Sequence, residues 1–235
     1  MKYASIVPLI GGETIAMQNV FGKKPEYILS YEDFNANDNH LVEYYKREVP
    51  YHLIGDDGVP NVPSVDVINT VCPCAGLSSL NTSASSNAAA NDWMRTSANH
   101  VLGKLKPQVF WGENAPRLAS KMGEPVVRDL REIGRNFGYT FSLYKTKSIL
   151  HGLGQVRDRA FYFFWKGKKV PQFEYITREH EKIEETIRSV KRDPNDPMSV
   201  LVKSSAPTED PFYKYVLMRL TAVSVIMTFK QIKKH

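Results

Sequence analysis

Cysteine is scarce in this chain of 235 residues: there are only two, Cys72 and Cys74, with Pro73 between them. A disulfide framework needs more cysteines at wider spacing, and a Cys-Pro-Cys pair alone supplies too few ligands for a structural zinc site. We therefore expect neither disulfides nor a bound metal. A pair this close indicates either a reactive thiol or an inert buried one.

Long apolar runs are also missing. No run approaches the roughly 20 residues that span a bilayer. Residues 1–7 lack an apolar core followed by a small-residue cleavage site, so we interpret them as part of a first strand and not as a signal peptide. We expect a cytoplasmic protein that has no membrane partner.

The excess of positive charge is modest, because 31 Lys and Arg residues face 25 Asp and Glu residues, which gives a net charge of +6. Its distribution is uneven, since eight basic residues fall in one short stretch. They are Lys145, Lys147, His151, Arg157, Arg159, Lys166, Lys168 and Lys169. Such a cluster is typical either of a phosphate-binding surface, which would make binding salt-dependent, or of a solvated basic face.

Short apolar runs alternate with helical patterns over the first 165 residues. The runs predict strands at 6–9, 27–31, 52–54, 65–71, 109–111, 140–144 and 160–165. The helical patterns lie at 15–21 behind Thr14 as N-cap, 37–47 with Leu41, Tyr44 and Tyr45 inward, 92–105 and 126–137. This alternation predicts an α/β fold with a mostly parallel, doubly wound sheet, whose ligands bind beyond the carboxyl ends of the strands.

The sharpest motif is Val-Cys-Pro-Cys-Ala-Gly-Leu-Ser at 71–78, directly after the near-continuous apolar run of a buried strand. Proline fixes one backbone angle and glycine permits unusual ones. A thiol held in such a turn is well placed to attack a ligand, although a small buried cysteine in a tight turn is equally consistent with the pattern. The Ser-, Ala- and Asn-rich segment that follows, 78–91, predicts a mobile loop.

Two further motifs follow predicted strands or precede them. Glu113-Asn114 comes after the run at 109–111, where a carboxylate in buried surroundings can hold a proton for general acid work, or can cap a helix. Gln155, Arg157 and Arg159 alternate before the last strand, so they can face one site or form a surface ion-pair ladder.

In this order and context the three motifs resemble those of the DNA cytosine-5 methyltransferases, a Rossmann-like family that uses S-adenosylmethionine. That family has Pro-Cys followed by Gly and Ser, then Glu-Asn before a Val-Pro-like pair, then Gln-x-Arg-x-Arg. The corresponding residues here are Pro73-Cys74, Gly76, Ser78, Glu113-Asn114, Ala115-Pro116, Gln155, Arg157 and Arg159. The resemblance covers about residues 1–165.

The resemblance implies a role for each matched residue. Cys74 would add to a flipped cytosine, and Cys72 would not, since it stands where the family usually has a second proline. Glu113 would hold the ring nitrogen of the base, and Arg159, with Arg157 nearby, would contact its carbonyl. Asn114 would position the turn that carries Cys74. The remaining substrate-binding residues would be Ser78 and Gln155.

The resemblance also implies a cofactor site. The family opens with a Phe-x-Gly-x-Gly-Gly-like turn, of which the segment 8–13 keeps only Gly11 and Gly12. Glu32 matches the acid that holds the ribose hydroxyls, and Asp56 matches the residue near the adenine amine; surface turn acids are the alternative for both. Pro73 completes the expected cofactor-binding set.

We expect residues 1–167 to form the catalytic domain and 168–235 a charged, helical extension in place of a full recognition domain. The implied partner is double-stranded DNA, as in restriction–modification systems, with a second chain as a possible source of recognition. Alternatives are an RNA cytosine-5 methyltransferase, or a non-catalytic or split-partner relative that binds nucleic acid or cofactor. An enzyme on free nucleotides also uses Pro-Cys but lacks the two downstream motifs.

Overall fold

The computed structural model describes residues 1–173, 185 and 188–189. Its strands are β1 (Tyr3–Ile6), β2 (Ile28–Tyr31), β3 (Tyr51–Ile54), β4 (Val67–Thr70), β5 (Val109–Asn114), β6 (Thr140–Lys147) and β7 (Asp158–Trp165). Its helices are α1 (Gly12–Phe21), α2 (Glu32–Tyr44), α3 (Asp92–His100) and α4 (Glu124–Asn136). Short 3-10 helices lie at Ala89–Asn91, Pro116–Ala119 and Ser148–His151, and a π-helical segment, Val101–Leu105, continues α3. These elements lie in the first of two units of the chain, Met1–Glu181.

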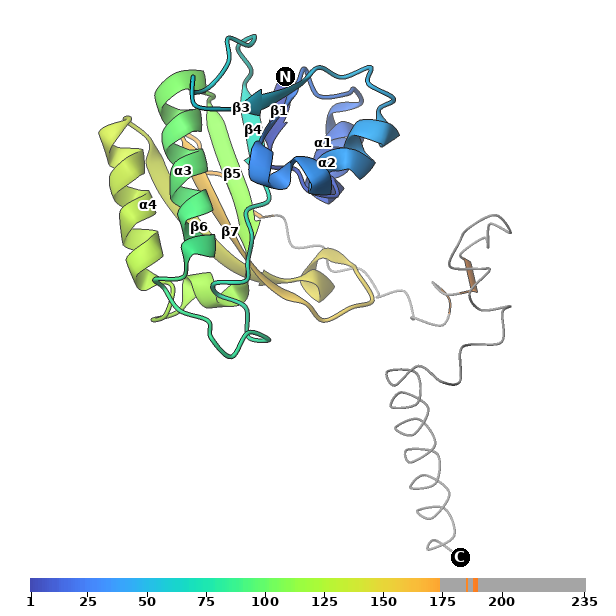
Figure 1. Ribbon diagram of the computed structural model, residues 1–235. Coiled ribbons are helices and arrows are strands. Elements are labelled where there is room, and N and C mark those ends of the chain that lie inside the picture. The colour runs from blue at the N-terminus through green and yellow to red at the C-terminus, as the bar shows by residue number, and fades with distance from the viewer. Residues whose placement is uncertain (174–184, 186–187, 190–235) are drawn as a thin grey trace, which may run out of the picture. The chain divides into compact units, whose positions relative to one another are not determined.

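The seven strands form one sheet in the order β3-β2-β1-β4-β5-β7-β6 (Figure 1). All neighbours from β3 to β5 pair in parallel, whereas β7 runs antiparallel to both β5 and β6. The predicted mostly parallel α/β fold is therefore confirmed. Because β7 is reversed, its first residues lie at the same edge of the sheet as the carboxyl ends of the other strands.

Helices cover both faces of the sheet. Figure 1 shows α1 and α2 on one side and α3 and α4 on the other. Every residue of β1 and β2 is buried, as expected for central parallel strands. A large apolar cluster includes residues of β4, β5 and β7 with α3 and α4, and a smaller one joins β2 to α2.

The prediction that Thr14 caps the first helix is wrong. The helix begins earlier, at Gly12, and Gly11 precedes it in the left-handed region at φ 85°. Thr14 is fully buried inside the helix, and its hydroxyl shares a 2.7 Å hydrogen bond with that of Ser5 in β1. Glycine alone adopts the left-handed turn at low cost, so the glycine pair, not the threonine, sets the start of the helix.

The second helix also differs from the prediction at its start and in its buried face. It begins at Glu32, in accord with the stabilisation of acidic side chains in a first helical turn. Its inward residues are Phe34, Asp38, Leu41 and, just past the end, Tyr45. Tyr44, which we expected to face inward, is 53% exposed.

The fifth strand is longer than the apolar run predicted. It continues through Glu113 and Asn114, because β7 pairs with all six of its residues. The Glu-Asn pair therefore lies within a strand, and not after one.

None of the helices in the described part of the chain is long and apolar enough to cross a membrane. The cytoplasmic location stays a prediction. The predicted extension at 168–235 lies almost entirely outside the described residues, and the boundary at 167 stays a prediction as well.

Candidate active site

A cavity of about 890 Å³ lies where β1, β4 and β5 end and β7 begins. Four separate segments line it: Pro8, Gly12 and Glu13 after β1; Pro73, Cys74 and Ser78 after β4; Glu113 in β5; and Arg157 and Arg159 at the start of β7. The carboxyl ends of neighbouring parallel strands meet at one edge, which brings these distant segments together.

The two cysteines of the turn after β4 have opposite surroundings. Cys72 is buried, with its sulfur 3.4 Å from the Thr70 hydroxyl and 3.8 Å from that of Ser97. Burial raises the pKa of the Cys72 thiol, so it stays protonated and enclosed. Cys74 is exposed at the cavity, where its thiol can meet a ligand.

Asn114 connects the end of β5 to the cysteine turn. Its side chain is fully buried, and its Nδ2 donates to the carbonyls of Cys72 and Pro73 at 3.4 and 3.5 Å. Its Oδ1 accepts a 2.9 Å hydrogen bond from the amide of Ala115. These contacts couple the position of Cys74 to the strand that carries Glu113.

Glu113 and Arg159 face the cavity because of the strand register. Glu113 lies opposite Phe161 in the β5–β7 pair, and opposed residues point to the same face of a sheet. Arg159, two residues before Phe161, shares that face, and its Nε contacts the Glu113 carboxylate. Arg157 lies two residues further back and lines the cavity as well.

The Glu113 side chain is only 15% exposed. Burial raises its pKa to about 7, the Glu13 carboxylate acts in the same direction, and Arg157 opposes both. The contact with Arg159 also favours the charged form. A carboxyl group with a pKa near neutrality can give up or accept a proton at physiological pH.

Glu13 lines the cavity too, and we did not predict it as a site residue. Burial raises its pKa, while its own backbone N–H and Arg157 act in the opposite direction. The signal in the sequence was its place directly after Gly11-Gly12, in the turn that leaves the first strand. That turn faces the cysteine turn because β1 and β4 are neighbours in the sheet.

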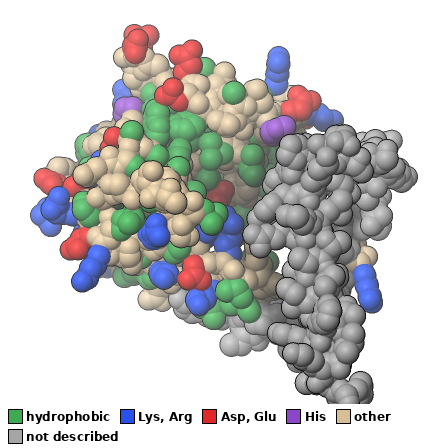
Figure 2. Space-filling model, turned by 60° about the horizontal axis from the view of Figure 1, so that its bottom comes forward, with side chains coloured by type: hydrophobic (Ala, Val, Ile, Leu, Met, Phe, Trp, Pro, Cys, Tyr) green, Lys and Arg blue, Asp and Glu red, His purple; other side chains and the backbone are tan. Residues whose placement is uncertain are grey.

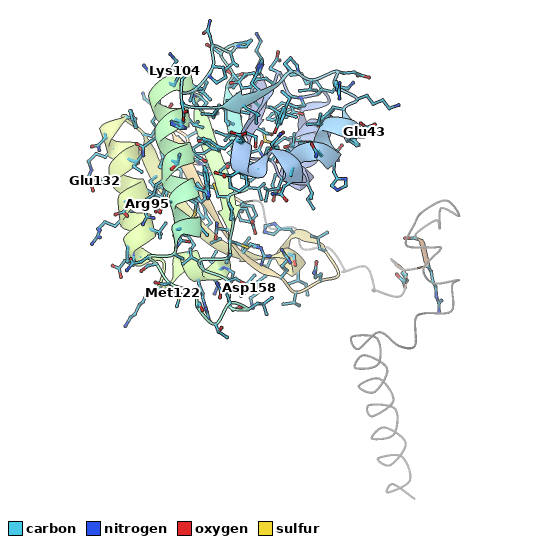
Figure 3. All side chains as sticks on the ribbon, in the orientation of Figure 1. Glu43, Arg95, Lys104, Met122, Glu132 and Asp158 are labelled. Atoms are coloured by element: carbon cyan, nitrogen blue, oxygen red, sulfur yellow. The ribbon has the colours of Figure 1, made fainter. Side chains whose placement is uncertain are left out.

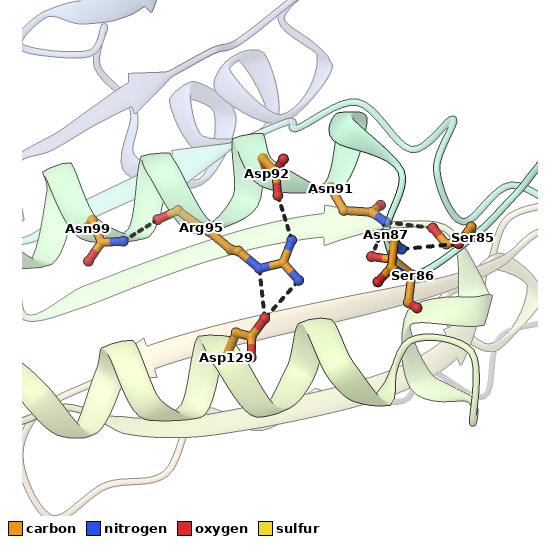
Figure 4. Close-up of polar contacts among 8 residues, drawn as sticks. All are labelled: Ser85, Ser86, Asn87, Asn91, Asp92, Arg95, Asn99 and Asp129. Atoms are coloured by element: carbon orange, nitrogen blue, oxygen red, sulfur yellow. Dashed lines mark hydrogen bonds and ion pairs between the residues drawn. The ribbon is translucent and has the colours of Figure 1, made fainter.

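The segment after the cysteine turn is irregular, as predicted, up to the short helical turn Ala89–Asn91. Ser78 lines the cavity, and its carbonyl accepts a 3.1 Å hydrogen bond from Arg117. At the far end, the Asn91 amide donates to the carbonyls of Ser85 and Ser86 (Figure 4). The mobility of this segment stays a prediction.

The same close-up shows how the base of the segment is held to the rest of the fold. Arg95 of α3 contacts Asp129 of α4 and Asp92 of its own helix (Figure 4). Asn91 also contacts the cysteine turn. A Cβ on Gly76 of that turn would lie 2.4 Å from Asn91 Oδ1, so glycine is needed at this position.

The expected cofactor residues lie beyond three adjacent strands. Gly12 lines the cavity, and Gly11 packs so closely that a Cβ would come within 2.3 Å of Leu41 Cδ1. Glu32 and Asp56 follow β2 and β3 and are exposed, but neither lines the cavity. Leu9, where the family pattern has glycine, adopts φ 50°.

The structure does not bring Gln155 into the cavity. It is exposed in the turn before β7, and its carbonyl accepts a hydrogen bond from the Ser148 hydroxyl. The expected sharing of one site by Gln155 and the two arginines is therefore not seen, since of the three only Arg157 and Arg159 line the cavity.

The basic stretch is not one patch. Lys145 and Lys147 lie on β6 beside Asp158, with nitrogen–oxygen distances of 3.8 and 3.9 Å, at the cavity edge of the sheet. Lys166 and Lys168 follow the other end of β7. The seven steps from Asp158 to Trp165 separate the two ends of the strand by about 23 Å. Figure 3 labels Asp158 at the first edge, and Lys and Arg side chains recur among hydrophobic ones on the face in Figure 2.

Within the described part of the chain no group of three or more His, Cys, Asp or Glu side chains is arranged to hold a metal ion. The ionisable groups at the cavity are the exposed Cys74 thiol, the carboxylates of Glu13 and Glu113 and the guanidinium groups of Arg157 and Arg159.

Comparison with known proteins adds a family to this geometry. A family model for C-5 cytosine-specific DNA methylases matches residues 1–219. The chain is similar in structure to a protein from E. coli assigned as a prophage-encoded DNA modification methyltransferase, with a TM-score of 0.63 and 14% identity over 82% of this chain and 56% of that one. It is also similar to the Entamoeba histolytica methyltransferase EhMeth, with a TM-score of 0.53 and 13% identity over 77% and 57% of the two chains.

At these identities the structural likeness shows the fold alone. The chain spans less than two thirds of the length of either structure. No curated protein sequence matches it significantly.

Proposed function

The chain belongs to the family of C-5 cytosine-specific DNA methylases, and we propose on this basis that it transfers a methyl group to carbon 5 of cytosine in DNA. The observation that carries the proposal is the meeting of Cys74, Glu113, Arg157 and Arg159 around one cavity. These residues come from three segments that are far apart in the sequence, and a shared ligand is the simplest reason for their convergence.

Cys74 is the proposed nucleophile. Carbon 5 of cytosine is a poor nucleophile in the aromatic ring, but addition of a thiolate at carbon 6 converts the ring to an enamine-like species whose carbon 5 attacks a methyl donor readily. After transfer, loss of the carbon 5 proton and of the thiolate restores the aromatic ring and frees Cys74. The exposed thiol fits this role, and the enclosed Cys72 does not.

Glu113 is the proposed acid. A protonated carboxyl group at the ring nitrogen stabilises the adduct, since the charge that the thiolate brings into the ring is neutralised there. A pKa of about 7 keeps a substantial fraction of Glu113 protonated at neutral pH. Arg159, in contact with that carboxylate, and Arg157 beside it are placed to donate to the base carbonyl.

The remaining polar residues have supporting roles. Asn114 positions the cysteine turn through its two hydrogen bonds to backbone carbonyls, and Ser78 is available to the substrate at the cavity wall. Gln155 can reach nucleic acid only outside the cavity.

S-Adenosylmethionine is the proposed cofactor, and when bound it supplies the methyl group on its sulfonium. The arrangement of the expected residues fits such a molecule. Gly12 and Pro73 line the cavity, and Gly11 lies behind the turn. Glu32 and Asp56 lie beyond the cavity lining, after the next two strands of the sheet. Gly12 has open space where a Cβ would stand, so a ligand can approach the backbone there. Glu32 and Asp56 would hold ribose hydroxyls and the adenine amine.

Double-stranded DNA is the proposed partner. A base inside a duplex cannot reach the cavity, so the target cytosine has to leave the stack. We propose that the segment 78–91 closes over it and that basic residues at the cavity edge contact phosphates. Sequence recognition would come from the residues after 167 or from a second chain.

Methyl transfer from radiolabelled S-adenosylmethionine tests the proposal directly. Incubation of the chain with unmethylated duplex DNA, with an RNA of matched sequence and with each nucleic acid plus the Cys74→Ala variant should give 5-methylcytosine in the DNA arm alone. Methyl groups in the RNA arm would support an RNA cytosine-5 methyltransferase instead. Absence of transfer in both arms, with nucleic acid bound, would support a non-catalytic relative.

A further inference from the structure

Glu13 is a second acidic side chain of the cavity, and the chemistry proposed above leaves it without a task. It lies in the first turn of α1 and lines the same cavity as Cys74 and Glu113. The segment that carries it joins β1 to α1, whereas Glu113 comes from β5, so the two glutamates approach the cavity from different sides.

Its surroundings are unusual for a carboxylate. Glu13 forms no salt bridge with any described residue, although it is largely shielded from solvent and interacts electrostatically with Glu113 and Arg157. Arg157 interacts electrostatically with both glutamates, and the guanidinium group of Arg159 contacts Glu113. Two carboxylates thus share the cavity with two guanidinium groups, and the contact between Glu113 and Arg159 leaves Glu13 without a salt bridge among them.

A shielded carboxylate without a salt bridge is costly, because desolvation disfavours its charge. The cost is removed when a ligand brings a positive group to it. S-Adenosylmethionine has such a group next to the transferred methyl: the sulfonium must come close to carbon 5 of a base that is itself held by Cys74 and Glu113. A carboxylate that interacts with Glu113 is therefore near the place where the sulfonium has to lie.

We propose that Glu13 faces the cofactor's sulfonium and makes the cavity selective for the methyl donor over its demethylated product. The inference rests on the proposed function. S-Adenosylhomocysteine keeps the ribose, adenine, ammonium and carboxylate groups but has a neutral thioether in place of the sulfonium. Glu13 distinguishes the two by charge alone, so it favours binding of the donor and release of the product.

The burial that raises the pKa of Glu13 is consistent with this role, since a sulfonium would supply the countercharge that offsets desolvation of the carboxylate. A purely structural role predicts something else. A glutamate that only stabilised the first turn of α1 would affect both ligands equally, because the turn contacts whichever of them is bound.

Calorimetry on the full chain with S-adenosylmethionine and S-adenosylhomocysteine separates these two roles. Glu13→Gln keeps the shape and removes the charge. It should weaken binding of S-adenosylmethionine by about tenfold, as expected for one partly screened charge pair, and should leave the affinity for S-adenosylhomocysteine within about twofold. Glu13→Asp, which keeps the charge on a shorter side chain, should recover part of the selectivity.

Glu43→Gln is a matched control, because Glu43 is an exposed glutamate on α2 that points away from the rest of the domain (Figure 3). It should leave both affinities unchanged, and thermal melts should show that all variants fold. Equal weakening of both ligands by Glu13→Gln, or no change in either, would overturn the assignment of Glu13 while leaving the proposed function intact. Failure of the unaltered chain to bind either ligand would overturn both.

Discussion

At the scale of single residues, the Cys-Pro-Cys segment shows how two identical side chains acquire different chemistry. The chain leaves strand geometry after Thr70, so the two cysteines do not share one face as residues at a spacing of two do within a strand. One sulfur enters the core beside Thr70 and Ser97, and the other reaches the cavity.

We predict that Cys74→Ala abolishes methyl transfer and that Cys72→Ala retains most of it. The Cys74 thiol is exposed at the cavity, whereas the Cys72 thiol is buried. A duplex that contains 5-fluorocytosine traps the covalent adduct, because fluorine blocks loss of the substituent at carbon 5. The adduct should appear with the unaltered chain and with Cys72→Ala; its survival in Cys74→Ala would show that another residue is the nucleophile.

Glu113 should make stability depend on pH. Its pKa is raised to about 7 by burial, so the folded state holds a proton that the unfolded state releases at lower pH. The stability that this proton contributes is fully present below the unfolded pKa of about 4.5 and is lost as pH rises through about 7, an effect on the order of 2–3 kcal/mol.

Urea denaturation between pH 5 and pH 8 tests this. The free energy of unfolding should fall more steeply with pH in the unaltered chain than in Glu113→Gln, which cannot titrate. Glu132→Gln, an exposed position on α4 (Figure 3), should behave like the unaltered chain. Parallel pH curves for the unaltered chain and Glu113→Gln would mean that Glu113 titrates normally.

At the scale of secondary-structure elements, strand pairing and helix ends place the site. The reversal of β7 brings Arg159 to Glu113, and the buried side chain of Asn114 connects β5 to the turn after β4. An amide in that position satisfies two carbonyls that no strand partner reaches.

We predict that Asn114→Ala lowers the free energy of unfolding by about 1–2 kcal/mol, since buried carbonyls lose their donor. It should also slow formation of the 5-fluorocytosine adduct, because the Cys74 turn loses its connection to β5. Asn99→Ala is the control, as Asn99 is exposed and donates only to Arg95 in its own helix. A variant with normal stability and normal adduct formation would show that Asn114 does not position the turn.

The end of α2 offers a test of backbone strain away from the cavity. Lys46 is exposed, follows the C-cap residue Tyr45 and adopts φ 48°, which costs little only for glycine. Lys46→Gly should raise the free energy of unfolding by about 1 kcal/mol. Lys46→Ala should leave it unchanged, and equal effects of the two substitutions would show that the backbone angle is not the cause.

At the scale of the whole molecule, charge near the cavity should govern nucleic-acid binding. The basic residues that are neighbours in sequence divide between two edges of the sheet, and those at the cavity edge lie nearer to DNA that enters the site. Phosphate contacts of this kind give affinity without sequence preference.

We predict salt-dependent duplex binding that Lys147→Ala weakens and Lys168→Ala does not. The slope of log K against log salt should fall by about 0.9 for each phosphate that the variant no longer neutralises. Fluorescence anisotropy over a salt series, with random and defined duplexes, measures both slope and specificity. Equal slopes for the two variants would place DNA elsewhere, and strong preference for one duplex would point to a recognition element in the chain after residue 167.

The sequence by itself determined the class of fold and the family. Strands and helices alternate with periods that local patterns record, and three motifs in the right order identify a family even though each alone is ambiguous. Cys74, Glu113, Arg157 and Arg159 were all predicted as site residues from these motifs, and all four line the cavity.

Tertiary structure decided what depends on pairing between distant segments. It placed Glu13 in the cavity, because β1 lies beside β4. It left Gln155 outside the cavity, in the turn before β7, and it divided the basic stretch between two edges of the sheet. No local period encodes which strands become neighbours or where one begins to pair. These choices are made by burial of the two apolar faces and by backbone hydrogen bonds across the sheet, which act over separations that a sequence pattern does not show.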